Sequence, residues 1–154
     1  MTRAAVPVAP IALRAGDAAP RATRPPLTRT DFVRYAGASG DFHPIHHDEA
    51  FAAQAGAESV FGTGLLHGGM LGAHLARWVG PANVRSFTLR FLARVWPGDG
   101  LELSGAVEEV VHVAGDAYAV VGLEATSSRG DVVARARATV TIAARQRGPA
   151  GAGR

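Results

Sequence analysis

The hydrophobic period of this chain changes at Gly80-Pro81, and that change constrains the fold more than any other feature. Residues 64–79 are mostly apolar and read as one long helix, which Gly80 and Pro81 end. Beyond them, apolar and polar residues alternate through 86–95, the rhythm of a half-buried strand. Further strands are predicted at about 101–113, 118–127 and 132–143. A long helix followed by a run of strands predicts an α+β domain with an antiparallel sheet around that helix.

The two faces of the 64–79 helix differ in residue type. Mostly small residues recur on one face at spacings of four, three and four: Leu65, Gly69, Gly72 and Ala76. Such a stripe lets a helix lie close to a sheet, so we expect it to face the strands. His67 and His74 lie on the opposite face. We expect both to be interior or interface histidines with satisfied hydrogen bonds rather than catalysts.

The N-terminal part carries signals for an extended segment and two short helices. Residues 13–26 suit an extended segment that includes a short edge strand. Thr28 and Asp31 have the spacing of a capping box, for a helix that ends near Gly37. A second helix is predicted at 49–55, and two of its features are expected from the pattern: an N-cap at Asp48 and an inward-facing Phe51.

Residues 40–48, Gly-Asp-Phe-His-Pro-Ile-His-His-Asp, form the stretch richest in reactive side chains. Pro44 fixes its own φ and keeps His43 out of helical geometry, so the turn is stiff. A stiff turn that holds Asp41 and His46 five positions apart can aim both side chains at one water molecule. A carboxylate and an imidazole are the groups that acid/base chemistry on a carbonyl compound needs.

Gly64 opens the long helix, eighteen residues after His46. The first amides of a helix have no partner inside it and carry the positive end of the helix dipole. A glycine there lets a ligand oxygen approach the backbone N–H closely. This is the arrangement of an oxyanion hole for an enolate.

These motifs together resemble one known family. The stretch 35–48, the helix that begins at Gly64 and the segment 95–99 resemble the MaoC-like (R)-specific enoyl-thioester hydratases and dehydratases. The likeness covers roughly residues 27–143. It implies a hot-dog fold, in which an antiparallel sheet wraps around one long central helix.

The resemblance also implies roles for particular residues. By position in the family motif Asp-x-Asn-Pro-x-His-x-Asp, Asp41 and His46 would be the catalytic pair on a bound water. The Gly64 amide would form the oxyanion hole for the thioester oxygen. The substrate-binding positions implied alongside are His43, Thr63, Leu65 and Gly72.

The chain departs from the family pattern at several of these positions. His43 stands where the family has Asn, Thr63 where a His often precedes the oxyanion glycine, and Gly72 where some relatives have Ser. A second pair, His67-Gly68, looks like the family's His-Gly but lies one helical turn later. We favour Gly64 because that choice needs no gap. The Asp/His pair is intact, so activity is expected.

Length and composition indicate one domain at 13–145, with disordered tails at 1–12 and 146–154. The chain has no cysteine and no lysine, which excludes disulfides, thiolate zinc sites and a Schiff-base lysine. The net charge is +3, but the arginines are scattered and not interleaved with aromatics, so no nucleic-acid partner is expected. No apolar run is long enough for a membrane span or a signal peptide, and a cytoplasmic location is expected.

The function implied by the resemblance is (R)-specific hydration of trans-2-enoyl thioesters, or the reverse dehydration of 3-hydroxyacyl thioesters. The acyl carrier would be coenzyme A or an acyl carrier protein, and no cofactor is expected. A five-stranded sheet on one helix leaves an edge uncovered, so we expect a homodimer.

Three alternatives remain open at the level of sequence. The same features fit a non-catalytic acyl-thioester-binding subunit of a hot-dog heteromer, or a hot-dog thioesterase. A metal site is the third alternative, with these conceivable ligands: His43, His46, His47 and Asp48. Adjacent His46 and His47 tend to point apart and no distant ligand cluster completes the shell, so no metal is expected.

Overall fold

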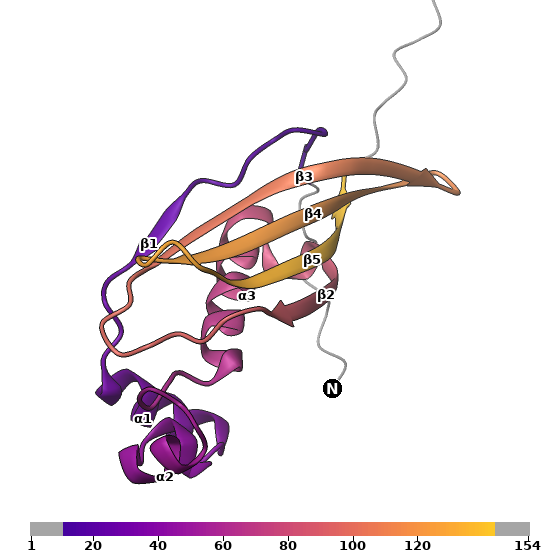
Figure 1. Cartoon of the computed structure of the whole chain (residues 1–154). Coiled ribbons are helices and arrows are strands. Elements are labelled where there is room, and N and C mark those ends of the chain that lie inside the picture. The colour runs from indigo at the N-terminus through magenta and orange to yellow at the C-terminus, as the bar shows by residue number, and fades with distance from the viewer. Residues whose placement is uncertain (1–10, 144–154) are drawn as a thin grey trace, which may run out of the picture.

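A computed structural model describes residues 11–143 (Figure 1). The predicted α+β order is confirmed, with helices first and most of the sheet after them. The elements in chain order are β1 (Ala22–Arg24), α1 (Arg29–Ser39), η1 (Pro44–His46), α2 (Glu49–Gln54), α3 (Gly64–Val79), η2 (Pro81–Asn83), β2 (Val84–Phe91), β3 (Leu101–Val113), β4 (Asp116–Ser127) and β5 (Val132–Ile142).

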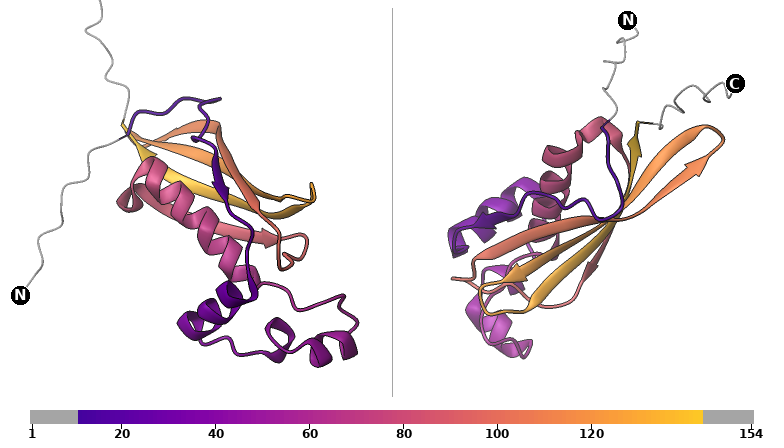
Figure 2. Two further views of the ribbon diagram at one scale, coloured as in Figure 1. Left: turned by 90° about the vertical axis from the view of Figure 1, so that its left-hand side faces the viewer. Right: turned by 90° about the horizontal axis from the view of Figure 1, so that it is seen from above.

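The five strands form one antiparallel sheet in the order β1-β3-β4-β5-β2. β3, β4 and β5 are a meander, and the turn between β3 and β4 places Ala114 and Gly115 at positive φ. The short strand expected within 13–26 is β1, which lies at one edge against β3. β2 lies at the other edge against β5. Figure 2 shows the sheet curving over α3, so the expected wrapping around one long helix is confirmed.

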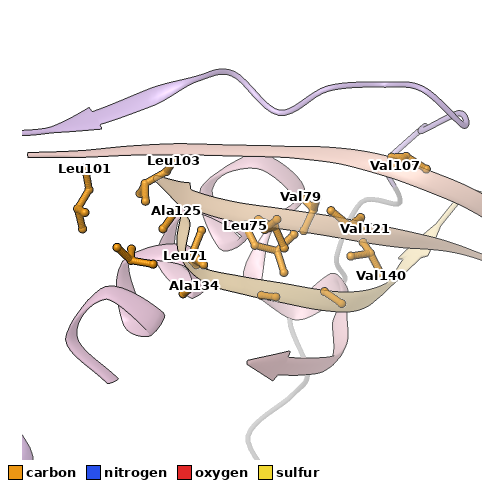
Figure 3. Packing of buried hydrophobic residues seen from close by; sticks show 14 of the residues in the cluster. Leu71, Leu75, Val79, Leu101, Leu103, Val107, Val121, Ala125, Ala134 and Val140 are labelled. Carbon is orange, nitrogen blue, oxygen red and sulfur yellow. The ribbon is translucent and has the colours of Figure 1, made fainter. Parts of the chain in front are cut away.

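The core lies between α3 and the concave face of the sheet (Figure 3). Leu71, Leu75 and Val79 of α3 pack against inward-facing residues of β3 to β5, such as Leu103 and Val121. All five are almost fully buried. Burying a side chain of this size contributes about 1.5–3 kcal/mol, so this helix face is the principal apolar contact of the domain.

The expected orientation of α3 is wrong. Leu65 is 55% exposed, and Gly69 is exposed as well, so the stripe of small residues does not face the sheet. The buried residues of the helix are His67, Gly68, Leu71, His74, Leu75 and Val79. This face offers more apolar area than the glycine stripe, and apolar area removed from water decides which face turns inward.

Glycines nevertheless bring α3 close to a strand, and of these glycines only Gly72 belongs to the predicted stripe. Gly64, Gly68 and Gly72 follow one another at intervals of four residues beneath β2. A Cβ on Gly68 would lie 2.7 Å from Leu89 Cδ1, and one on Gly64 would lie 3.2 Å from the ring of Phe91. These glycines let side chains of the edge strand contact the helix backbone.

The two short helices lie together near the N-terminal end of α3 (Figures 1 and 2). The capping box is confirmed, since Thr28 Oγ1 accepts from the Asp31 N–H and Asp31 accepts from the Thr28 N–H. α1 ends at Ser39 rather than near Gly37, because Gly40 supplies the left-handed cap at φ 76°. 

The predicted cap of α2 is also confirmed, since Asp48 Oδ1 accepts from the Phe51 N–H at 3.1 Å. The inward orientation of Phe51 is wrong: it is 38% exposed, and Ala52 is the residue that α2 buries.

One strand ends earlier than expected, and the predicted tails lie mostly outside the described residues. The strand expected at 86–95 ends at Phe91, and Val95 is buried within the connection that follows. The predicted tails lie outside residues 11–143 except for 11 and 12, and Ile11 there forms a bridge with Ile142. 

Candidate active site

Polar groups within the turn between α1 and α2 hold its shape. The Asp41 N–H donates to Ser39 Oγ (3.2 Å), and the His43 N–H donates to Asp41 Oδ1 (3.3 Å). The Ile45 N–H donates to His43 Nδ1 (3.3 Å) where η1 begins. Together with the fixed φ of Pro44, these bonds limit how far the Asp41 and His46 side chains can separate.

Asp41 and His46 are brought together across this turn. His46 Nε2 lies 3.8 Å from Asp41 Oδ2, with the His46 side chain 12% exposed and the Asp41 side chain 40% exposed. His46 Nδ1 lies 2.7 Å from the carbonyl oxygen of Phe61. Because a carbonyl oxygen only accepts, Nδ1 must carry the proton. In the neutral ring, Nε2 is therefore an acceptor that faces the carboxylate.

Aromatic rings fix the plane of the His46 imidazole. The ring of Phe61 meets it edge-on with centroids 5.3 Å apart, and Trp96 meets Phe61 in the same way at 5.9 Å. The Arg94 guanidinium lies 4.8 Å from the Phe61 centroid, within the range of a cation–π contact. Phe61 thus contacts His46 through both its carbonyl and its ring.

Hydrogen bonds to a buried carboxylate stabilise the turn that contains Trp96. Asp99 is 2% exposed, and its Oδ2 accepts from the Trp96 N–H at 2.9 Å. Its Oδ1 accepts from Arg129 Nε at 2.7 Å. The sequence analysis gave Asp99 no role beyond its place in the segment 95–99; an Asp three residues after Trp96 is the local signal for such a side-chain-to-backbone bond.

The first turn of α3 borders a pocket of about 340 Å³. The residues that line it are Phe61, Gly62, Gly64, His67, Phe91, Leu92, Ala93 and Arg94. Thr63 is the N-cap but makes no side-chain cap bond, and within residues 11–143 no acceptor is recorded for the Gly64 N–H. Phe61 therefore contacts the His46 imidazole and also lines the pocket, whereas Asp41 and His46 are not among the lining residues.

A model of the MaoC like domain matches residues 14–128, most of the chain. The chain belongs to the MaoC-like domain family. The 3-hydroxybutyryl-CoA dehydratase of Methylorubrum extorquens is 38% identical to this MaoC-like chain over 91 residues, which are 55% of each protein. The chain thus spans about half the length of that curated relative.

Solved structures show the same fold. The (R)-hydratase from A. caviae involved in PHA biosynthesis superposes with a TM-score of 0.73 at 21% identity, covering 85% of this chain and 98% of that one. A chain of the ChsH1-ChsH2 complex from Mycobacterium tuberculosis gives a TM-score of 0.71 at 24% identity, covering 84% and 98%. The MaoC-like chain has a hot-dog fold, as expected.

The remaining predicted substrate-binding residues of this MaoC-like domain lie in different places. His43 is exposed, and its ring meets Phe51 edge-on at 5.4 Å. Thr63 is buried beside Gly64. Leu65 points to solvent, and Gly72 lies two turns along α3 against Phe87 at 3.7 Å from its Cβ position. Only Gly64 among the predicted substrate-contacting positions lines the pocket.

His67 lines the pocket although sequence reasoning gave it no role there. The expectation that its hydrogen bonds are satisfied is wrong, since neither ring nitrogen has a partner within residues 11–143. His74 Nε2 has none either. Burial lowers the pKa of His67 from 6.5 to about 4, and burial also lowers the pKa of His74. Both histidines are interior, as expected, but they are not satisfied.

Two properties of the described region bear on other classes of function. Among residues 11–143, no three or more histidine or acidic side chains group as metal ligands would, so His43, His46, His47 and Asp48 do not form such a set. In the same residues, no helix has the length and apolar character needed to cross a bilayer.

Proposed function

We propose that this MaoC-like domain hydrates trans-2-enoyl thioesters to (R)-3-hydroxyacyl thioesters and catalyses the reverse dehydration. The observation that carries the proposal is the pairing of Asp41 with a His46 ring whose tautomer is set by the Phe61 carbonyl. Family membership supports the reaction class, because the matched model describes MaoC-like domains and the curated relative is named a dehydratase.

The proposed base is His46 Nε2. Asp41 Oδ2 and His46 Nε2 are both acceptors at 3.8 Å, and a water that donates one hydrogen to each would hold them roughly 4 Å apart. The water oxygen bonds to C3 while its proton passes to Nε2, and the C2–C3 π electrons move to form the enolate. The proton then passes from Nε2 to C2, so that one water is added in total.

The proposed oxyanion donor is the N–H of Gly64. It lies at the start of α3, where the helix dipole favours negative charge, and it borders the pocket. The thioester oxygen would accept from it as the enolate forms. Loss of one such donor costs about 10²–10³-fold in kcat.

Substitution of the catalytic pair tests the proposal. Asp41→Asn and His46→Gln should each lower kcat/KM for a short trans-2-enoyl-CoA by about 10²–10⁴-fold, the usual contribution of acid/base catalysis. The measurement is the loss of enoyl-thioester absorbance, with the chirality of the product determined. His47→Ala is the matched control, because His47 is an exposed neighbour outside the pair. Near wild-type turnover in either active-site variant would exclude the assigned role.

Removal of one backbone N–H tests the oxyanion assignment. Gly64→Pro deletes the donor at the first helical position, where proline is tolerated, and Thr63 already has the extended ψ of 134° that precedes proline comfortably. Gly64→Ala keeps the N–H and adds the same Cβ toward Phe91. We expect the proline variant to lose about 10²-fold more kcat than the alanine variant. Equal rates would assign the donor elsewhere.

We further propose short acyl chains and a homodimer. The name of the curated relative, 3-hydroxybutyryl-CoA dehydratase, supports a four-carbon substrate on coenzyme A. The outer edge of β2 has no strand partner among residues 11–143, and exposed apolar side chains of Leu65, Phe91 and Leu92 accompany it. A second copy paired there would cover the edge and these side chains.

A further inference from the structure

His67 is a buried polar side chain that the described part of the chain leaves without hydrogen-bond partners. It is 2% exposed, and neither Nδ1 nor Nε2 has a hydrogen-bond partner within residues 11–143. Leaving a buried donor or acceptor unpaired costs about 1–3 kcal/mol, so such a group in a native fold calls for an explanation. His74 shows that an unpaired ring nitrogen alone does not mark a site, because its Nε2 is unpaired as well.

The pocket at the start of α3 distinguishes His67 from His74. His67 lines it together with Gly64, whereas His74 does not. Residues three apart on a helix share one face, so the Gly64 backbone and the His67 ring border the pocket from the same side. Phe91 contacts both: its ring lies 5.6 Å from the His67 centroid and 3.2 Å from the Cβ position of Gly64.

The lining of this pocket selects for a ligand that accepts hydrogen bonds. Its side chains are apolar except for His67 and Arg94, and none of them is a carboxylate. Gly64 also lines the pocket, and its N–H has no backbone acceptor within residues 11–143. A ligand group placed here meets donors and aromatic carbon, which suits a carbonyl oxygen that gains negative charge.

We propose that the His67 imidazole is a second hydrogen-bond donor to the thioester carbonyl oxygen, beside the Gly64 N–H. The inference rests on the proposed hydratase function and adds a catalytic residue to it. The proton stays on the imidazole throughout, and the bond to the oxygen strengthens as the enolate forms. Because burial lowers the pKa of His67 to about 4, the ring is neutral near pH 7 and brings no net charge into the apolar pocket.

A comparison of two leucine substitutions tests the inference. His67→Leu and His74→Leu each replace a buried, incompletely bonded imidazole on α3 with an apolar side chain, so both should unfold at the same or a higher temperature than the wild type. We expect His67→Leu to lower kcat for a short trans-2-enoyl-CoA by about 10²-fold, as loss of an oxyanion donor does, and His74→Leu to leave it unchanged. His67→Gln retains a donor and should recover part of the loss.

A binding measurement keeps this inference separate from the proposed function. Butyryl-CoA, a saturated thioester that cannot be hydrated, is added to wild-type protein carrying ¹⁵N-labelled histidine. Displacement of the His67 ring ¹⁵N resonance, assigned by its absence from His67→Leu, supports the inference even if enoyl-CoA is not turned over, in which case the proposed function fails. Wild-type kcat in His67→Leu, or a His67 resonance that butyryl-CoA does not move, overturns the inference and leaves the hydratase proposal standing.

Discussion

At the scale of residues, a backbone carbonyl oxygen sets which ring nitrogen of the candidate base, His46, carries the proton. Asp41 and His46 are five positions apart within one stiff turn, and their proximity could be predicted from sequence. The acceptor that orients His46 is the backbone carbonyl of Phe61, fifteen residues away. Since every residue type carries such a carbonyl, no sequence pattern points to it.

The histidines of α3 give a residue-scale prediction for stability. Buried His67 binds a proton in the folded state only near pH 4, whereas an unfolded imidazole does so near pH 6.5. Between these values the unfolded chain holds more protons, so the free energy of unfolding falls as pH falls. Urea unfolding at about pH 7 and about pH 4 should show wild type losing about 3 kcal/mol more than His67→Leu. Parallel losses in the two proteins would contradict the burial-driven pKa.

At the scale of elements, short-range signals predict the N-caps of α1 and α2 and the bounds of α3, but not which face of α3 turns inward. The caps of α1 and α2 and both ends of α3 follow from short-range side-chain and glycine chemistry, which is present in the sequence. The choice of which α3 face turns inward depends on the area offered by β3 to β5, and in α2 it is Ala52, not Phe51, that packs in a small buried cluster with Ala57 and Val60. Which side chains are buried in these helices is therefore determined by contacts with residues distant in sequence.

The approach of β2 to α3 gives an element-scale prediction. Gly68→Ala would place a Cβ 2.7 Å from Leu89 Cδ1, so the strand or its side chain must shift. The added Cβ meets only side-chain atoms of Leu89 and Phe91, and alanine also favours the helix at both positions, so we expect Gly68→Ala to be less stable than Gly69→Ala by about 1 kcal/mol. Gly69→Ala is the matched control: open space surrounds its Cβ position, and helix propensity should raise stability by up to about 1 kcal/mol. Equal effects in urea titrations would contradict the close contact.

At the scale of the whole molecule, the sheet order leaves β2 with one edge that no strand of residues 11–143 pairs. The apolar side chains exposed near that edge are Leu65, Phe91 and Leu92, and a separate apolar pair, Val111 and Val113, lies on the far part of β3. The number of strands and their alternation of apolar and polar residues can be predicted from the sequence. Which strand lies outermost depends on pairings between segments distant in the chain. The identity of the unpaired edge strand, β2, therefore follows from the structure and not from the sequence.

A charge placed at either apolar site tests which one joins two copies. Leu92→Arg should shift the protein from dimer to monomer in sedimentation velocity at micromolar concentration, because a buried unpaired guanidinium opposes association. Val113→Arg, of similar exposure and chemistry but at the end of β3, should leave the mass unchanged. If only Val113→Arg dissociates the dimer, the interface lies at the β3–β4 hairpin instead.

The double use of Phe61 has a consequence for protein engineering. Its carbonyl fixes the proton on His46 Nδ1, while its ring forms part of the wall next to Gly64. A saturation library at this one codon therefore reshapes the cavity yet cannot erase the group that prepares the base. Because the Phe61 ring also meets His46 edge-on, altered acyl preference should come with the least loss of rate from substitutions that keep an aromatic ring at this position.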